Sequence, residues 1–224
     1  MDAKFVFKLP DTIPSDIGAL IEPLAVAWHA IEQSGAKPGD NVLVMGAGPI
    51  GLAVIQCLKA RQPRQIIVAE VAPNRKRFAQ MFGATTVIDP REQDVVSECK
   101  KLCDGQGPDS AIDCAGVAAS IKSACLSVRS KGAVVNVALW EKEFLFDMHA
   151  LLFGEKRLLT ALSYTSADFE AVIKALDNGS LDVKEMITSR ITIDKVVEDG
   201  ILALSREQAN DIKIIVDVRA KESS

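Results

Sequence analysis

Hydrophobic residues in the central part of the chain fall into short unbroken runs, each separated from the next by a stretch with helical periodicity. Runs without polar alternation are typical of strands that are buried on both faces of a parallel sheet. Strands that alternate with helices form βαβ units, so the pattern predicts an α/β fold with a doubly wound parallel sheet. We expect strands at 42–45, 65–70, 86–88, 110–114 and 133–137 and helices at 49–60, 74–82, 95–102 and 118–128.

The pattern is looser on both sides of this region. The apolar residues 5–9 predict a short strand, and residues 16–34 predict a helical region that kinks or restarts at Pro23. Ser166 is the expected N-cap of a later amphipathic helix. After Trp140 we expect helices at 148–153, 167–177 and 195–204, a sixth strand of the sheet at 157–164, and further strands at 187–193 and 212–218.

The stretch from Asn41 to Gly51 carries the clearest chemistry, because an apolar run leads directly into a G-x-G-x-x-G turn. In such a turn the first glycine permits the tight bend, the second lets the backbone approach a pyrophosphate, and the third lets the helix pack on the strand. Pro49 suits the first helical turn, where free N–H groups face the phosphates. The motif predicts a Rossmann dinucleotide-binding site that includes Gly46, Gly48, Pro49, Ile50 and Gly51.

Glu70 ends the second predicted strand, about twenty residues after the glycines. A carboxylate at this place accepts hydrogen bonds from the adenosine ribose and repels a 2′-phosphate, so it favours NAD over NADP. Arg75 begins the next helix and is close enough in sequence to reach the same ribose. Because an arginine can also accommodate a 2′-phosphate, Arg75 weakens the preference for NAD.

Composition restricts the class of protein further. The chain has 224 residues, is 48% hydrophobic and carries a net charge of −4, which is typical of a folded protein and disfavours a nucleic-acid partner. No apolar run approaches the ~20 residues that span a bilayer, and the first residues lack a signal-peptide core. We therefore expect a soluble cytoplasmic protein without a membrane partner. The five cysteines are expected to be reduced, and Cys99 and Cys103, spaced for half a metal site, have no second pair nearby.

Several segments together resemble one family. The residues Glu22 to Ala30, Lys37 to Val44 and Gly46 to Gly51, with Asp113 to Gly116 and Met186 to Arg190, are similar to the zinc-dependent medium-chain dehydrogenases. The closest resemblance is to the 2,3-butanediol and sorbitol dehydrogenase branch of these alcohol dehydrogenases. The resemblance covers nearly the whole chain.

The resemblance also implies a second domain. In the family, an N-terminal GroES-like catalytic domain precedes this region and carries the first zinc ligands, and this chain does not contain it. We therefore expect residues 1–23 to be the tail of a truncated catalytic domain, 24–164 to be the NAD-binding domain, and 165–224 to be the C-terminal remnant of the catalytic domain. Zinc is the metal of the family, but with two histidines the expected set of ligands is incomplete here, so we predict no metal site.

Two residues remain as candidates for acid–base chemistry. Glu22 occupies the position of an acidic residue of the family's zinc site, and His29 follows it by seven residues, two helical turns later and on the same helix face. The pair could transfer protons. Alternatively, Glu22 is a relic of the zinc site and His29 is structural, as its Trp-His-Ala context in the family implies.

The resemblance further implies where the nicotinamide lies and how chains associate. The nicotinamide half of NAD would lie along Val26, Cys114, Ala115, Val137, Ala138 and Leu139. The sixth strand is the sheet edge that these dehydrogenases pair across a two-fold axis, so a homodimer is expected.

The sequence thus predicts an NAD-dependent alcohol or polyol dehydrogenase homologue that acts on a small-molecule substrate. Two alternatives stay open. One is a truncated relative with zinc-independent or non-redox chemistry in the exposed cleft, using Glu22, His29 or His149. The other is a binding module or fragment without catalysis.

Overall fold

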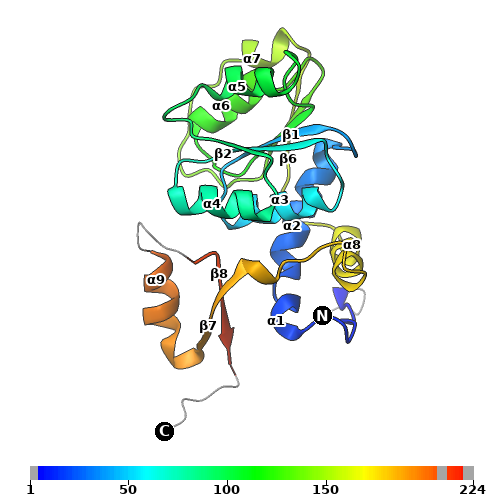
Figure 1. Ribbon diagram of the computed structural model, residues 1–224, viewed down its shortest axis with the longest axis vertical. Coiled ribbons are helices and arrows are strands. Elements are labelled where there is room, and N and C mark those ends of the chain that lie inside the picture. Colours follow the sequence, from blue (N-terminus) through cyan, green and yellow to red (C-terminus); the bar gives the residue numbers. More distant parts are fainter. Residues whose placement is uncertain (1–4, 206–210, 219–224) are drawn as a thin grey trace.

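A six-stranded parallel sheet is the centre of the computed structural model, which describes residues 5–205 and 211–218 (Figure 1). Its strand order is β3-β2-β1-β4-β5-β6, and every neighbouring pair is parallel. This order places the switch point of the topology between β1 and β4, where an α/β sheet opens a crevice at the carboxyl ends of its strands. The strands are β1 (Asn41–Met45), β2 (Gln65–Ala69), β3 (Thr86–Ile88), β4 (Ser110–Asp113), β5 (Ala133–Asn136) and β6 (Arg157–Thr160).

Helices cover both faces of this sheet, which explains why its strands read as unbroken apolar runs. Successive side chains of a strand point to opposite faces, so Val42 and Val44 of β1 join one core while Leu43 and Met45 join the other. The first core contains α2 (Ile21–Ser34), α3 (Pro49–Lys59) and α4 (Pro73–Phe82), and the second contains α5 (Val95–Leu102), α6 (Ala118–Ser127) and α7 (His149–Leu152).

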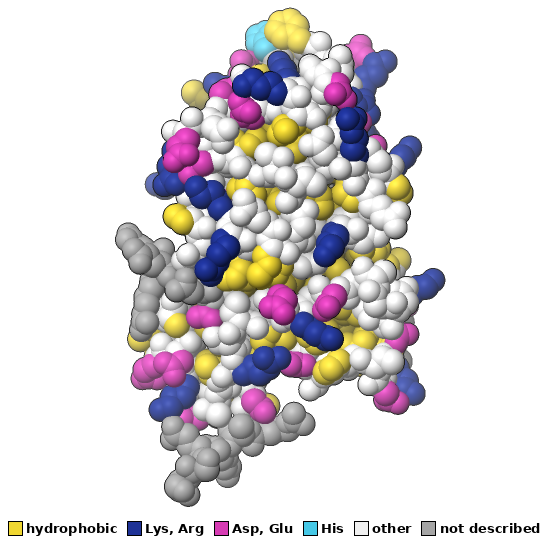
Figure 2. All heavy atoms as spheres, in the orientation of Figure 1, with side chains coloured by type: hydrophobic (Ala, Val, Ile, Leu, Met, Phe, Trp, Pro, Cys, Tyr) yellow, Lys and Arg dark blue, Asp and Glu magenta, His cyan; other side chains and the backbone are white. Residues whose placement is uncertain are grey.

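A smaller part of the molecule lies below the first layer of helices in Figure 1. It holds a separate two-stranded parallel sheet. Hydrophobic side chains gather in a band where this part meets the larger one (Figure 2). Its elements are α1 (Ser15–Gly18), α8 (Ser166–Asp177), η2 (Lys184–Met186), β7 (Ile187–Thr192), η3 (Ile193–Lys195), the π-helical turn η4 (Val196–Ile201), α9 (Leu202–Leu204) and β8 (Lys213–Asp217).

The expected strand at 5–9 was wrong. Residues 6–10 form no strand, and the Phe7 ring instead stacks on Phe169 of α8 with 4.8 Å between centroids. The apolar side chains of this segment therefore reflect packing against a helix and not pairing within a sheet.

Three helix boundaries also differ from expectation. Thr165, not Ser166, caps α8, because its hydroxyl accepts a hydrogen bond from the backbone N–H of Asp168. Pro23 lies in the first turn of α2, so the helical region restarts at Ile21, after a break that follows Gly18. The predicted helix at 195–204 is divided between π-helical and α-helical turns. No helix among the described residues is long and apolar enough to cross a membrane.

Candidate functional site

The glycine turn after β1 has the backbone geometry that its sequence predicts. Gly46 has a φ of +87° and donates its N–H to the carbonyl of Ala69 at 2.8 Å. A Cβ on Gly51 would lie 2.0 Å from the Gly46 carbonyl oxygen, so only glycine fits there. A Cβ on Gly48 would have no neighbour closer than 3.9 Å, and that neighbour is the Arg75 guanidinium. The backbone of Gly48 is therefore open to a ligand on the side of Arg75.

The N-terminus of α3 adds electrostatic character to this turn. Gly48 is the N-cap residue, Pro49 begins the helix, and no side chain caps the first turn. The uncapped N–H groups and the helix dipole make this terminus attractive to an anion. The turn therefore suits the pyrophosphate of a dinucleotide.

Glu70 follows β2 and connects the end of that strand to the glycine turn. It is only 5% exposed. One carboxylate oxygen, Oε2, accepts a hydrogen bond from the Ala47 N–H at 2.7 Å, and Oε1 accepts hydrogen bonds from Val71 at 2.7 Å and Ala72 at 2.8 Å. The carboxylate is thus held rigidly beside the turn, at the carboxyl edge of the sheet.

Sequence reasoning missed a second acidic residue at this edge. Asp89, directly after β3, is 4% exposed and accepts hydrogen bonds from Lys76 at 2.7 Å and from Arg91 at 3.0 and 2.7 Å. The Arg91 and Lys76 side chains hold the pKa of Asp89 far below its usual range. Arg91 also donates to the Val71 carbonyl at 2.6 Å. The signal was present in the sequence as an Asp and an Arg two residues apart at a strand end.

A pocket of about 440 Å³ opens beside the end of β4, and it gathers every residue that the resemblance assigns to the nicotinamide. Its floor is apolar and includes the Cys114 thiol, whose pKa is raised by burial. Ala161, Leu162 and Ser163 also line it, because β6 ends at Thr160 instead of continuing to residue 164 as expected. The predicted lining residues are Val26, Ile50, Cys114, Ala115, Val137, Ala138 and Leu139.

A second pocket of about 370 Å³ lies on the other side of the glycine turn. Gly48 and Arg75 line it together with Lys213 of β8. Lys213 is more than 160 residues from the turn in sequence, and nothing in the local pattern marks it as part of a site. The two cations and the α3 N-terminus give this pocket a positive character that suits phosphate oxygens.

Asp113, the last residue of β4, supports the loop between the two sides of the crevice. Its Oδ1 accepts a hydrogen bond from the Ala115 N–H at 3.2 Å, and its buried Oδ2 has no partner among the described residues. Burial raises the pKa of this carboxyl. Asp113 therefore fixes the backbone of Ala115 at the floor of the pocket.

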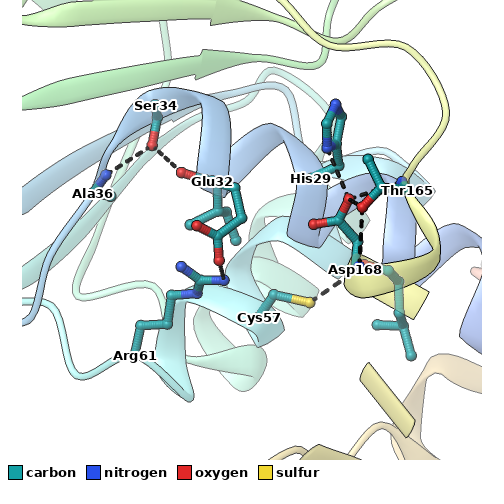
Figure 3. A network of polar contacts seen from close by, with 10 residues as sticks. His29, Glu32, Ser34, Ala36, Cys57, Arg61, Thr165 and Asp168 are labelled. Carbon is teal, nitrogen blue, oxygen red and sulfur yellow. Dashed lines mark hydrogen bonds and ion pairs between the residues drawn. The ribbon is translucent and has the colours of Figure 1, made fainter. Parts of the chain in front are cut away.

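The two acid–base candidates are not joined by any contact in the described part of the chain. Glu22 is exposed in the first turn of α2. His29 points instead toward Asp168, whose carboxylate lies 2.9 Å from its Nδ1 and also accepts hydrogen bonds from Thr165 (Figure 3). The His29 contact therefore joins α2 to the cap of α8, and a catalytic role for Glu22 or His29 stays a prediction.

The donor set does not fit zinc in the part of the chain that is described. Within residues 5–205 and 211–218, no three His, Cys, Asp or Glu side chains are grouped so as to hold a metal ion. A catalytic zinc ion requires three protein ligands. We therefore derive no step through zinc from the residues of this chain.

Comparisons with known proteins agree with this geometry. The sequence model described as zinc-binding dehydrogenase matches residues 49–178. The (R,R)-butanediol dehydrogenases of Neisseria gonorrhoeae and Bacillus subtilis are 36% and 34% identical to the chain, and each match covers 96% of the chain and 60% or 62% of the relative.

A solved structure extends the likeness to three dimensions. The crystal structure of 2R,3R-butanediol dehydrogenase from Bacillus subtilis superposes with a TM-score of 0.89 at 35% identity, covering 95% of this chain and 60% of that one. The chain thus spans about three-fifths of the length of these relatives. From its matched family model, its Rossmann sheet and its glycine turn, the chain belongs to the zinc-binding dehydrogenase family.

Proposed function

We propose that this chain is the cofactor-binding part of an NAD-dependent dehydrogenase that acts on alcohols or polyols of the 2,3-butanediol or sorbitol type. The observation that carries the proposal is the crevice at the switch point, where the open Gly48 backbone lies between an apolar pocket and a cationic pocket. A bound nicotinamide dinucleotide would supply the hydride acceptor or donor.

The residues of the chain bind and orient that cofactor in three places. The α3 N-terminus, Arg75 and Lys213 would hold the pyrophosphate, because they combine backbone N–H donors with two cations. Glu70 would accept the hydroxyl groups of the adenosine ribose. The apolar pocket formed by the ends of β4, β5 and β6 would exclude water from one face of the nicotinamide.

The proposal also divides the chain into parts. Residues 24–164 would form the cofactor domain, and residues 1–23 and 165–224 would belong to a second domain that packs against it. What supports this division is the separate β7–β8 sheet, which has its own strand order and lies below the helices of the larger sheet (Figure 1). Two parallel strands are fewer than an independently stable sheet needs.

A homodimer through β6 is the proposed assembly. The burial of β6 differs from that of its neighbour β5, because Arg157, Leu158 and Thr160 are exposed. Phe153 and Leu152 next to it are 84% and 66% exposed. In Figure 2, hydrophobic side chains lie beside a histidine at the top end of the molecule, over α7. An exposed edge strand with adjacent apolar side chains is typical of an interface.

Binding of NADH tests the cofactor claim. The variant Gly48→Asp keeps a preferred N-cap residue but brings a negative charge to the pyrophosphate position, and Gly48→Asn is the neutral control of the same shape. We expect calorimetry to show NADH binding to the wild type and to G48N. For G48D we expect affinity at least about tenfold weaker than for G48N, because like charges repel. No binding to folded wild type at millimolar NADH would overturn the proposal.

A further inference from the structure

The edge of the sheet near the end of β2 carries an arginine whose position is fixed before any ligand binds. The Nε and Nη2 atoms of Arg91 donate to the buried Asp89, and Nη2 also donates to the carbonyl of Val71. These bonds involve two of the three guanidinium nitrogens. Nη1 has no hydrogen-bond partner among the described residues, and the side chain is 59% exposed. The guanidinium therefore presents two unused N–H donors to solvent.

The place of this arginine follows from its contact with Val71. Val71 is the residue directly after Glu70, and the Glu70 carboxylate accepts the Val71 N–H. Arg91 thus contacts the same peptide segment that Glu70 organises. If the adenosine ribose binds at Glu70, as proposed above, its 2′ position faces the loop that Arg91 contacts.

The charge of Glu70 is itself strongly compensated. Three backbone N–H groups donate to its two oxygens, and those bonds reduce its capacity to accept further hydrogen bonds. Arg75 and Lys76 begin the next helix on the same side, and Lys76 joins Arg91 on Asp89. The surroundings of the predicted 2′ position are therefore richer in cations than the acidic residue at the strand end implies.

We propose that Arg91, oriented by Asp89 and the Val71 carbonyl, binds a 2′-phosphate on the adenosine ribose, so that the site accepts NADP(H) as well as NAD(H). This inference rests on the proposed function, because it requires the adenosine to bind at Glu70. An arginine suits the role, since its planar group donates two parallel hydrogen bonds to phosphate oxygens. Asp89 is a positioning residue here, because it contacts Arg91 and not the nucleotide.

Binding of adenosine fragments tests the assignment without any need for turnover. Adenosine 2′,5′-bisphosphate and 5′-AMP differ only in the 2′-phosphate and are titrated by calorimetry into the full chain. We expect the wild type to bind them with affinities within about tenfold of each other. Arg91→Gln should weaken binding of the bisphosphate by roughly tenfold or more and leave 5′-AMP unchanged, as expected for loss of a charge-assisted hydrogen bond.

Two further variants control for charge and for structure. Arg64→Gln removes a comparably exposed cation, 56% exposed, whose ion pair with Asp104 lies before β2, and we expect it to change neither affinity. Arg91→Lys keeps the charge and should retain part of the affinity for the bisphosphate. Equal weakening of both nucleotides by R91Q would show that Arg91 only supports the loop, and would overturn the inference.

The wild-type titrations separate the two proposals. If NADH and 5′-AMP bind but the bisphosphate binds more than about a hundredfold more weakly, Glu70 excludes the 2′-phosphate and only this inference fails. If neither NADH nor 5′-AMP binds the folded chain, the proposed function fails and the inference fails with it.

Discussion

At the residue scale, the site depends on two glycines whose surroundings are opposite. A side chain at Gly51 would collide with the Gly46 carbonyl, whereas a side chain at Gly48 would enter open space. The sequence motif predicts both glycines, because their spacing in the turn is diagnostic. It could not predict Arg91 or Lys213, whose roles depend on contacts between segments that are distant in the chain.

This contrast predicts different outcomes for the same substitution. Gly51→Ala should lower the free energy of unfolding by about 3 kcal/mol, since a Cβ 2.0 Å from a carbonyl oxygen forces the backbone apart. Gly48→Ala should cost less than about 1 kcal/mol. Urea denaturation of the two variants measures the difference, and equal losses would contradict the turn geometry described here.

At the element scale, the apolar runs predicted the six strands and their helices because each strand of a parallel sheet is buried on both faces. The segment at 5–9 has a similar composition, but it packs its aromatic ring on α8 instead. Local sequence could not distinguish the two cases, since the difference lies in a partner 160 residues away. The same limit applies to His29, whose partner Asp168 lies on α8.

The contact between α2 and α8 gives a pH-dependent prediction. Hydrogen bonds from Thr165 and His29 outweigh burial, which opposes ionisation, and lower the pKa of Asp168. A carboxyl with a lowered folded-state pKa stabilises the fold above its unfolded pKa of about 3.9, and this contribution is lost as pH falls through the folded value. Asp168→Asn should therefore cost about 1–3 kcal/mol at pH 7.

Denaturation at two pH values checks this sign. The difference between wild type and D168N should shrink as the pH is lowered from 7 toward 3. Asp104→Asn removes a 74% exposed partner of a surface ion pair, and it should change stability by less than about 1 kcal/mol at either pH. A difference for D168N that stays constant with pH would rule out the carboxylate as its source.

At the scale of the whole molecule, the fold, its strand order and the cofactor crevice followed from the sequence, whereas the arrangement of the smaller part did not. A two-stranded parallel sheet whose strands lie 20 residues apart leaves no periodic signal of its pairing. The exposed edge of β6, in contrast, agrees with the expected sixth strand over Arg157–Thr160.

The proposed dimer predicts a mass of twice the 24.1 kDa chain in solution. Phe153→Asp places a charge in the exposed apolar surface beside β6 and should give monomers, because a buried unpaired charge opposes association. Met81→Asp alters a 51% exposed residue on α4 and should leave the dimer intact. Light scattering coupled to size exclusion measures the mass, and a monomeric wild type would exclude this interface.

The hydrogen bond between Glu70 and the Ala47 N–H has a consequence for how binding energies combine. It joins the strand end that would hold the ribose to the turn that would hold the phosphates. A substitution on one side therefore perturbs the geometry of the other, and the free energies of separate nucleotide fragments should not sum to that of the intact cofactor. In a double-mutant cycle, changes at Glu70 and Gly48 should show a coupling energy above about 0.5 kcal/mol.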